Sequence, residues 1–147
     1  MKYSELASLT VYTDGGASNN GNANGSGLVN CYGSYLVVAL TYDGKFVPVK
    51  HEDRLPMPHL ETNNEAEYQS FVNGARYLIN LFDRTGIRVP VTFKIDSNLV
   101  FTQMSGKARC KALNLQHFYS EGKELVGVLN ATLERISGDE MKVVLGH

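Results

Sequence analysis

The sequence has few cysteines, no long apolar run and almost no net charge, and each of these absences excludes a class of protein. Its two cysteines, Cys31 and Cys110, provide neither a disulfide framework nor the ligand spacing of a zinc site. No apolar stretch approaches the length of a membrane-spanning helix, and residues 1–10 lack the pattern of a signal peptide. We therefore expect a protein of a reduced, cytoplasmic setting with no membrane partner.

The net charge of −1 gives no broad basic surface of the kind that marks many nucleic-acid-binding proteins. If nucleic acid is the partner, local basic groups or bound cations must offset the phosphate charge. A chain of 147 residues with 43% hydrophobic content suits a single domain with a proper core. We expect one domain spanning residues 1–147, present as a monomer.

Alternating apolar residues and turn signals predict three strands, then a helix, a strand, two helices and a final strand. The strands are predicted at residues 8–14, 28–41, 45–51, 89–96 and 141–145, and the helices at 62–84, 97–105 and 113–135. Residues 15–27 are rich in Gly, Asn and Ser, so we expect turn and loop there. A hairpin meander followed by alternating elements implies an α/β fold, with a mixed five-stranded sheet flanked by helices.

The helix predicted at residues 62–84 begins with two glutamates that have different roles. Thr62 and Glu65 have the spacing of a capping box, which satisfies free backbone N–H groups in the first turn. Glu67 lies four residues before Phe71, on the apolar face that turns toward the protein. A carboxylate there is costly unless it is paired, hydrogen-bonded or bound to a metal. A lone glutamate at a helix start is more often partly exposed, so Glu67 indicates a functional site only if other acidic residues lie beside it.

Asp14 and Asp96 supply such partners, because each ends an alternating strand and is followed at once by a turn-forming residue. If the two strands are parallel neighbours, both carboxylates emerge at the same edge of the sheet, where the first turn of the helix can bring Glu67. Each aspartate alone is more often a strand-end or cap residue. Together, the three carboxylates repel one another and favour a hard cation with oxygen ligands, Mg²⁺ or Mn²⁺ rather than Zn²⁺.

Four short motifs in order resemble those of type 1 ribonuclease H. They are YTDGGAS at residues 12–18, TNNEAEY at 62–68, IDSNLV at 95–100 and LGH at 145–147, so the resemblance runs from about residue 9 to residue 147. It implies an endoribonuclease that cuts the RNA strand of RNA–DNA hybrids, using two metal ions held by acidic residues. Asp14, Glu67 and Asp96 fall on three of the four acidic positions of the family, and Glu67 rather than Glu65 aligns.

The resemblance also implies substrate contacts. A wide minor groove displays 2′-hydroxyls that short amides and backbone groups can read. Asn20 lacks the proline that usually follows it in the family, and Asn63 and Asn64 can equally be residues that merely begin a helix. The positions that fall on hybrid contacts are Gly15, Asn20, Thr62, Asn63, Asn64 and Asn98, with Thr62 near a DNA phosphate.

The pattern departs from the family near residue 147. The fourth acidic residue of the family lies after the Gly-His pair, at the start of a final helix, and so would come after His147. Asp139 and Glu140 are expected at the wrong end of the last strand to replace it. A shortened chain, a site that works with three carboxylates and a crippled site remain open. His147 aligns with a mobile histidine that aids proton transfer or product release in the family.

The basic helix that some family members carry is reduced in this chain to a turn with Lys107, Arg109 and Lys111. The chain therefore resembles the compact subtype, and this turn is either a modest phosphate contact or a solvated surface. Two rival functions stay open. One is a hybrid-binding module that has lost turnover with its fourth acidic residue, and the other is a transposase or integrase core, which usually needs more chain than 147 residues.

Overall fold

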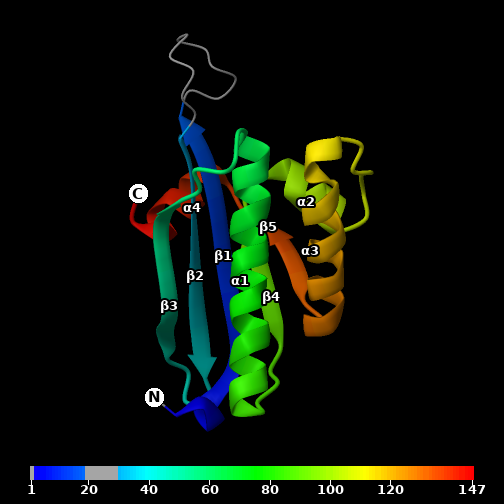
Figure 1. Ribbon diagram of the computed structural model, residues 1–147. Helices are drawn as coiled ribbons and strands as arrows, with labels where there is room; N and C mark the ends of the chain where they lie inside the picture. Colours follow the sequence, from blue (N-terminus) through cyan, green and yellow to red (C-terminus); the bar gives the residue numbers. More distant parts are fainter. Residues whose placement is uncertain (1, 19–29) are drawn as a thin grey trace.

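A computed structural model describes residues 2–18 and 30–147, and its centre is a five-stranded sheet in the order β3-β2-β1-β4-β5 (Figure 1). β1 pairs antiparallel with β2, and β2 with β3, whereas β4 joins β1 in parallel and β5 joins β4 in parallel. The strands are β1 (Leu6–Ser18), β2 (Asn30–Thr41), β3 (Phe46–Pro56), β4 (Val91–Ile95) and β5 (Thr132–Arg135). This is the predicted mixed sheet, with three antiparallel strands followed by parallel additions.

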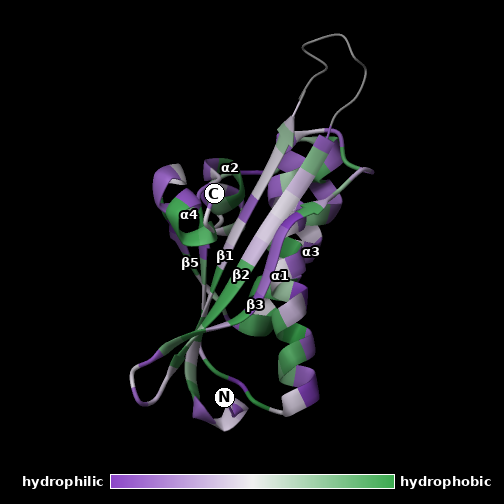
Figure 2. Ribbon diagram, turned by 90° about the vertical axis from the view of Figure 1, so that its left-hand side faces the viewer, coloured by the Kyte–Doolittle hydropathy of each residue, from purple (hydrophilic) through white to green (hydrophobic). Residues whose placement is uncertain are grey.

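Helices cover both faces of the sheet. They are α1 (Asn63–Thr85), α2 (Asn98–Met104), α3 (Gln116–Leu129) and α4 (Gly138–Leu145), with 3-10 helices at Tyr3–Glu5 and Leu113–Leu115. α1 and α3 pack on one face, and α4 lies on the other (Figures 1 and 2). No helix within the described residues is long and apolar enough to cross a membrane.

Two apolar cores follow from the alternation along β1 and β2. Leu9, Val11 and Val37 point toward α1 and join the larger core, which also contains Phe71 of α1 and Phe93 of β4. The opposite face carries a smaller core, formed by Leu36, Met141 and Leu145 with Tyr12 and Val38 packed against it. The predicted two-sided pattern of the first strand is therefore correct, and the second core explains why its outer face also needs a helix.

The predicted start and end of the long helix are confirmed at α1. The Thr62 hydroxyl accepts a hydrogen bond from the Glu65 backbone N–H at 3.2 Å, and Glu65 Oε1 accepts from the Thr62 N–H at 3.0 Å. These two bonds form the expected capping box. Gly86 ends the helix in the left-handed conformation at φ 73°, which glycine adopts without steric cost.

The predictions for the last third of the chain are wrong in two places. The helix predicted at 113–135 ends earlier, because Asn130 adopts a left-handed conformation and caps α3, and Thr132–Arg135 then forms β5. The strand predicted at 141–145 is the helix α4, capped by the Ser137 side chain. Met141 and Leu145, one turn apart, are both buried, whereas Val143 between them is 81% exposed. That burial has the period of a helix, not of a strand.

A smaller correction concerns residues 15–18, for which the sequence predicts turn and loop. β1 continues through them and pairs with β2 as far as Ser18 opposite Asn30. Because the ladder from β2 reaches this far, Asp14 lies inside a paired strand, with Ser34 as its register partner. The residues before and after Asp14 are therefore both paired with β2, and this pairing holds the first carboxylate of the predicted site in place.

Candidate active site

Asp14 and Asp96 lie together because β1 and β4 are parallel neighbours in register. Thr13 on β1 pairs with Ile95 on β4, so the next residue along each strand is an aspartate at the same edge of the sheet. The Ser97 side chain then caps α2, accepting a hydrogen bond from the Val100 backbone N–H at 3.2 Å. The chain thus turns into a helix directly after the second carboxylate, as the sequence predicted.

Glu67 reaches the same edge from the first turns of α1. The helix crosses β1 closely at Gly15, where an added Cβ would lie 2.4 Å from the Ala66 carbonyl carbon and 2.5 Å from the Glu67 backbone nitrogen. The Gly15 backbone N–H also lies near the carboxylates of Glu67 and Asp14 and opposes part of the rise in the pKa of each. Gly15 therefore permits the close approach of the strand and the helix that carry two of the three acidic groups.

The three carboxylates form one compact group. One oxygen of each of Asp14, Glu67 and Asp96 lies within 4.8 Å of the others. Glu67 is only 8% exposed, which agrees with its prediction to the buried face of the helix. Residues 2–18 and 30–147 hold no other group of three His, Cys, Asp or Glu side chains with this spacing.

The crowding and burial of the group make its ionisation unfavourable. Burial, then repulsion from Asp96 and Asp14, raises the pKa of Glu67 to about 9. Burial and the proximity of Asp96 raise the pKa of Asp14 to about 6, with His147 acting in the opposite direction. Burial also raises the pKa of Asp96. Such groups become stable as anions when a positive charge lies between them.

The donor set fits a divalent cation. All three side chains offer carboxylate oxygens, the ligands of hard ions such as Mg²⁺ and Mn²⁺, and none offers the nitrogen or sulfur that Zn²⁺ prefers. Asp96 Oδ1 is buried and has no hydrogen-bond partner among the described residues. A buried polar atom without a partner is costly, and a bound cation would satisfy it.

The predicted substrate residues surround this edge, apart from Asn20, which lies outside the described residues. Asn63 and Asn64 begin α1, Asn98 begins α2, and Asn64 and Asn98 are exposed. The Thr62 hydroxyl donates to Glu65 Oε1 at 2.9 Å, so its first role is to cap the helix. Their contacts with a hybrid stay a prediction.

His147 follows α4, where Gly146 caps the helix, and does not follow a strand as the apolar run at residues 141–145 predicted. Its ring nonetheless lies close enough to the acidic group to lower the pKa of Asp14. The Nε2 atom of His147 lies 2.6 Å from Asp53 Oδ1 on β3. Sequence reasoning did not single out Asp53, because its only signal is a place in a charged run, residues 50–54, that extends past the end of the strand predicted at 45–51.

Asp139 and Glu140 also lie elsewhere than predicted. They occupy the first turn of α4, not the far end of a strand. This helix begins beside the site, because a Cβ added to Gly138 would lie 3.7 Å from Asp96 Oδ2. Both side chains are exposed and lie outside the group of three carboxylates.

The basic turn, which the sequence left open as either a modest phosphate contact or a solvated surface, borders a hollow of its own, with a volume of ≈ 520 Å³. Its lining residues are Gly106, Lys107, Ala108, Arg109, Cys110 and Tyr119. Lys111, the third basic residue of the turn, is not among them. Two cations beside an open hollow suit a phosphate contact, which stays a prediction.

No protein-family model matches the chain. Solved structures with a similar fold include several RNase H proteins. The N-terminal RNase H domain of Rv2228c from Mycobacterium tuberculosis superposes with a TM-score of 0.70 at 21% identity, covering 92% of each chain. RNase H1 from Halobacterium salinarum superposes with a TM-score of 0.65 at 17% identity, covering 92% of this chain and 90% of its own.

A third neighbour was crystallised with nucleic acid. LC11-RNase H1 in complex with an RNA/DNA hybrid has a TM-score of 0.68 at 20% identity, covering 90% of this chain and 87% of its own. At these identities the likeness is one of fold, and the fold agrees with the one that the motifs predicted.

Proposed function

We propose that this protein, whose fold is that of the ribonucleases H, is an endoribonuclease that hydrolyses the RNA strand of RNA–DNA hybrids. The observation that carries the proposal is the convergence of Asp14, Glu67 and Asp96, three carboxylates from β1, α1 and the end of β4, within 4.8 Å. A neighbour of the same fold binds an RNA/DNA hybrid in its crystal, which supports the substrate class.

Asp14, Glu67 and Asp96 are the residues that would hold two Mg²⁺ or Mn²⁺ ions with substrate. Such ions, when bound, activate water and stabilise the leaving oxygen of a phosphodiester. The protein holds these oxygens in fixed places, because Asp14 lies inside the β1–β2 ladder and Gly15 lets the backbone of α1 at Ala66 and Glu67 lie directly against β1. The positions of the carboxylate oxygens are therefore set before substrate arrives.

The start of α1 provides the groups that would distinguish RNA from DNA. Asn63 and Asn64 lie in the first turn of α1, the helix that carries the buried Glu67, so a hybrid bound at the acidic group would present its minor groove to their amides. Amide groups can both donate to and accept from a 2′-hydroxyl. We propose that His147, which follows α4 and influences the charge of Asp14, exchanges a proton with the reacting strand.

A hybrid-binding module without turnover is the second function, and one observation favours it. Only three carboxylates gather within the described residues, whereas the ribonuclease H family uses four. Under this alternative the protein binds hybrids through the same surface and leaves the RNA strand intact.

A cleavage assay with a labelled RNA–DNA hybrid separates the two functions. The 147-residue protein is incubated in Mg²⁺ and in Mn²⁺ beside duplex RNA, duplex DNA and the Asp96→Asn variant. The enzyme proposal predicts cleavage of the hybrid alone, reduced about a hundredfold or more by the substitution. Because Mn²⁺ tolerates imperfect ligand geometry better, we expect a higher rate in Mn²⁺. Hybrid binding with no cleavage in either metal would support the binding module instead.

A further inference from the structure

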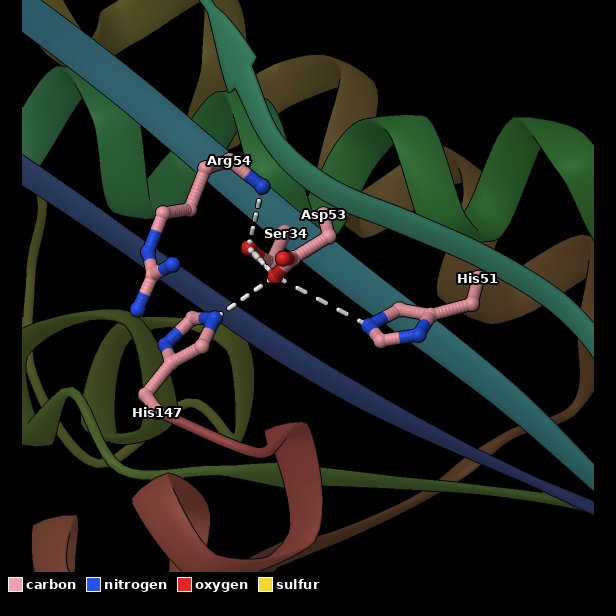
Figure 3. Close-up of polar contacts among 5 residues, drawn as sticks. All are labelled: Ser34, His51, Asp53, Arg54 and His147. Carbon is pink, nitrogen blue, oxygen red and sulfur yellow. Dashed lines mark hydrogen bonds and ion pairs between the residues drawn. The ribbon is translucent and has the colours of Figure 1, made fainter.

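A polar cluster on the α4 side of the sheet holds His147 in place (Figure 3). The His147 Nε2 atom lies 2.6 Å from Asp53 Oδ1, and the histidine side chain is only 13% exposed. His51 approaches the same carboxylate oxygen more distantly, at 3.8 Å. Asp53 and His147 are 94 residues apart, so the contact is made by the tertiary fold alone.

A β-bulge aims Asp53 at this histidine. Asp53 and Arg54 on β3 together face the single residue Ser34 on β2, and Arg54 adopts a positive φ of 50°. Positive φ is unfavourable for a residue with a side chain, and bulges of this kind redirect side chains near functional sites. The normal ladder resumes on both sides of the bulge, with Gly33 opposite Leu55 and Tyr35 opposite Glu52.

The carboxylate is also tied to β2, the strand that pairs with the one carrying Asp14. The Arg54 backbone N–H donates to Ser34 Oγ at 2.8 Å, and Ser34 Oγ donates to Asp53 Oδ1 at 3.4 Å. Ser34 is 2% exposed and is the register partner of Asp14. Ser34 therefore lies between the strand that carries Asp14 and the strand whose Asp53 contacts His147.

The chemistry of this contact determines which nitrogen of His147 is free. An ionised carboxylate only accepts hydrogen bonds, so the Nε2 atom that faces Asp53 must carry the hydrogen. The hydrogen bond from His147 lowers the pKa of Asp53, and Arg54 and His51 lower it further, which keeps the carboxylate ionised. In the neutral ring, Nδ1 is then the nitrogen with the lone pair.

We propose that Asp53 is a positioning residue for His147, holding its imidazole beside Asp14 with Nε2 as donor, so that Nδ1 exchanges protons with the substrate. A neutral ring accepts a proton at Nδ1, and the resulting imidazolium returns it from the same atom. The inference deepens the proposed ribonuclease function and rests on it. It adds a residue from β3, a strand that contributes nothing to the group of three carboxylates.

The kinetic test is a double-mutant cycle with Asp53→Asn, His147→Ala and the double variant. If Asp53 acts through His147, Asp53→Asn lowers kcat about tenfold, part of the contribution of a positioned acid–base group, and leaves KM for the hybrid unchanged. The same substitution has no further effect in the His147→Ala background. Glu52→Gln, which removes a neighbouring charge on β3 opposite Tyr35, is the matched control and keeps full activity. If the losses in kcat from the two single substitutions add in the double variant, the proposal is overturned.

A second measurement does not depend on catalysis. Long-range ¹H–¹⁵N spectra of the neutral His147 ring, assigned by comparison with His147→Ala, report which nitrogen carries the hydrogen. We expect the Nε2–H form in the wild type and a mixture in Asp53→Asn. A mixture already in the wild type would overturn the positioning role even if the hybrid is cleaved. Absence of cleavage by the wild type, with the Nε2–H form present, would instead count against the ribonuclease function alone.

Discussion

Gly15 and Ala66 meet so closely that no side chain fits between β1 and α1 at this point. A Cβ added to Gly15 would lie 2.4 Å from both the carbonyl carbon and the carbonyl oxygen of Ala66. Backbone atoms of a capped helix cannot move aside as a flexible side chain can. The contact therefore sets the distance between the strand that carries Asp14 and the helix that carries Glu67.

We expect Gly15→Ala to destabilise the protein and to separate two of the three carboxylates. Overpacking of this kind typically costs about 1–3 kcal/mol, because the helix must shift as a unit. Gly127→Ala is the matched control, since a Cβ added at Gly127 in α3 meets nothing within 4 Å. That change should be neutral or stabilise by up to about 1 kcal/mol. Urea unfolding of both variants tests the difference, and equal stabilities would contradict it.

Glu67→Gln should stabilise the metal-free protein while abolishing cleavage. The pKa of Glu67 is raised to about 9 by burial and by repulsion from Asp96 and Asp14, and a neutral amide removes both penalties. We expect the free energy of unfolding in EDTA to rise by about 1–2 kcal/mol, as for other substitutions that remove an active-site charge and stabilise the protein. Adding Mg²⁺ should then stabilise the wild type more than the variant. Thermal unfolding with and without Mg²⁺ measures this, and a variant less stable in EDTA would refute it.

The stability of the metal-free protein should fall as pH rises. The pKa of Asp14 is raised from 3.8 to about 6 and that of Glu67 from 4.5 to about 9, so the folded state binds more protons than the unfolded state between those values. The penalty is absent below the unfolded pKa values and complete above the folded ones. Urea unfolding in EDTA at several pH values from about 4 to about 9 should show this slope in the wild type. In Glu67→Gln the part due to Glu67 should be lost, and the part due to Asp14 and Asp96, whose pKa values are also raised, should remain.

Tyr68 and Gln103 share a buried hydrogen bond, so their substitutions should have coupled effects on the stability of the protein. The Tyr68 hydroxyl donates to Gln103 Oε1, joining α1 to α2 where both side chains are buried. Gln103→Leu leaves the hydroxyl without its partner and should cost about 1–3 kcal/mol. Adding Tyr68→Phe removes the unsatisfied hydroxyl and should recover part of that loss. Free energies of unfolding for the single and double variants provide the test, and strictly additive losses would exclude the coupling.

The sequence by itself determined the features that depend on near neighbours along the chain. Thr62 and Glu65 indicate the start of α1 because a capping box is made within four residues. The alternation of Leu9, Val11 and Thr13 sets the buried face of β1. Asp14 and Asp96 each follow a residue of the parallel pair Thr13 and Ile95, which places both at one end of that pairing, although β1 itself continues to Ser18. The acidic group was predictable for this reason, from local pattern and one topological rule.

Other features were decided only by tertiary structure. Residues 141–145 have the β-branched, apolar character of a strand, yet they form α4 because Met141 and Leu145 cover the outer face of the sheet beside Leu36. Short apolar runs do not specify their own secondary structure, so the surface that they cover decides it. The bulge at Asp53 and its bond to His147 have no local signal either. The bulge exists because the register between β2 and β3 shifts at Ser34. The bond exists because α4 brings the chain back to β3, where His147 meets Asp53.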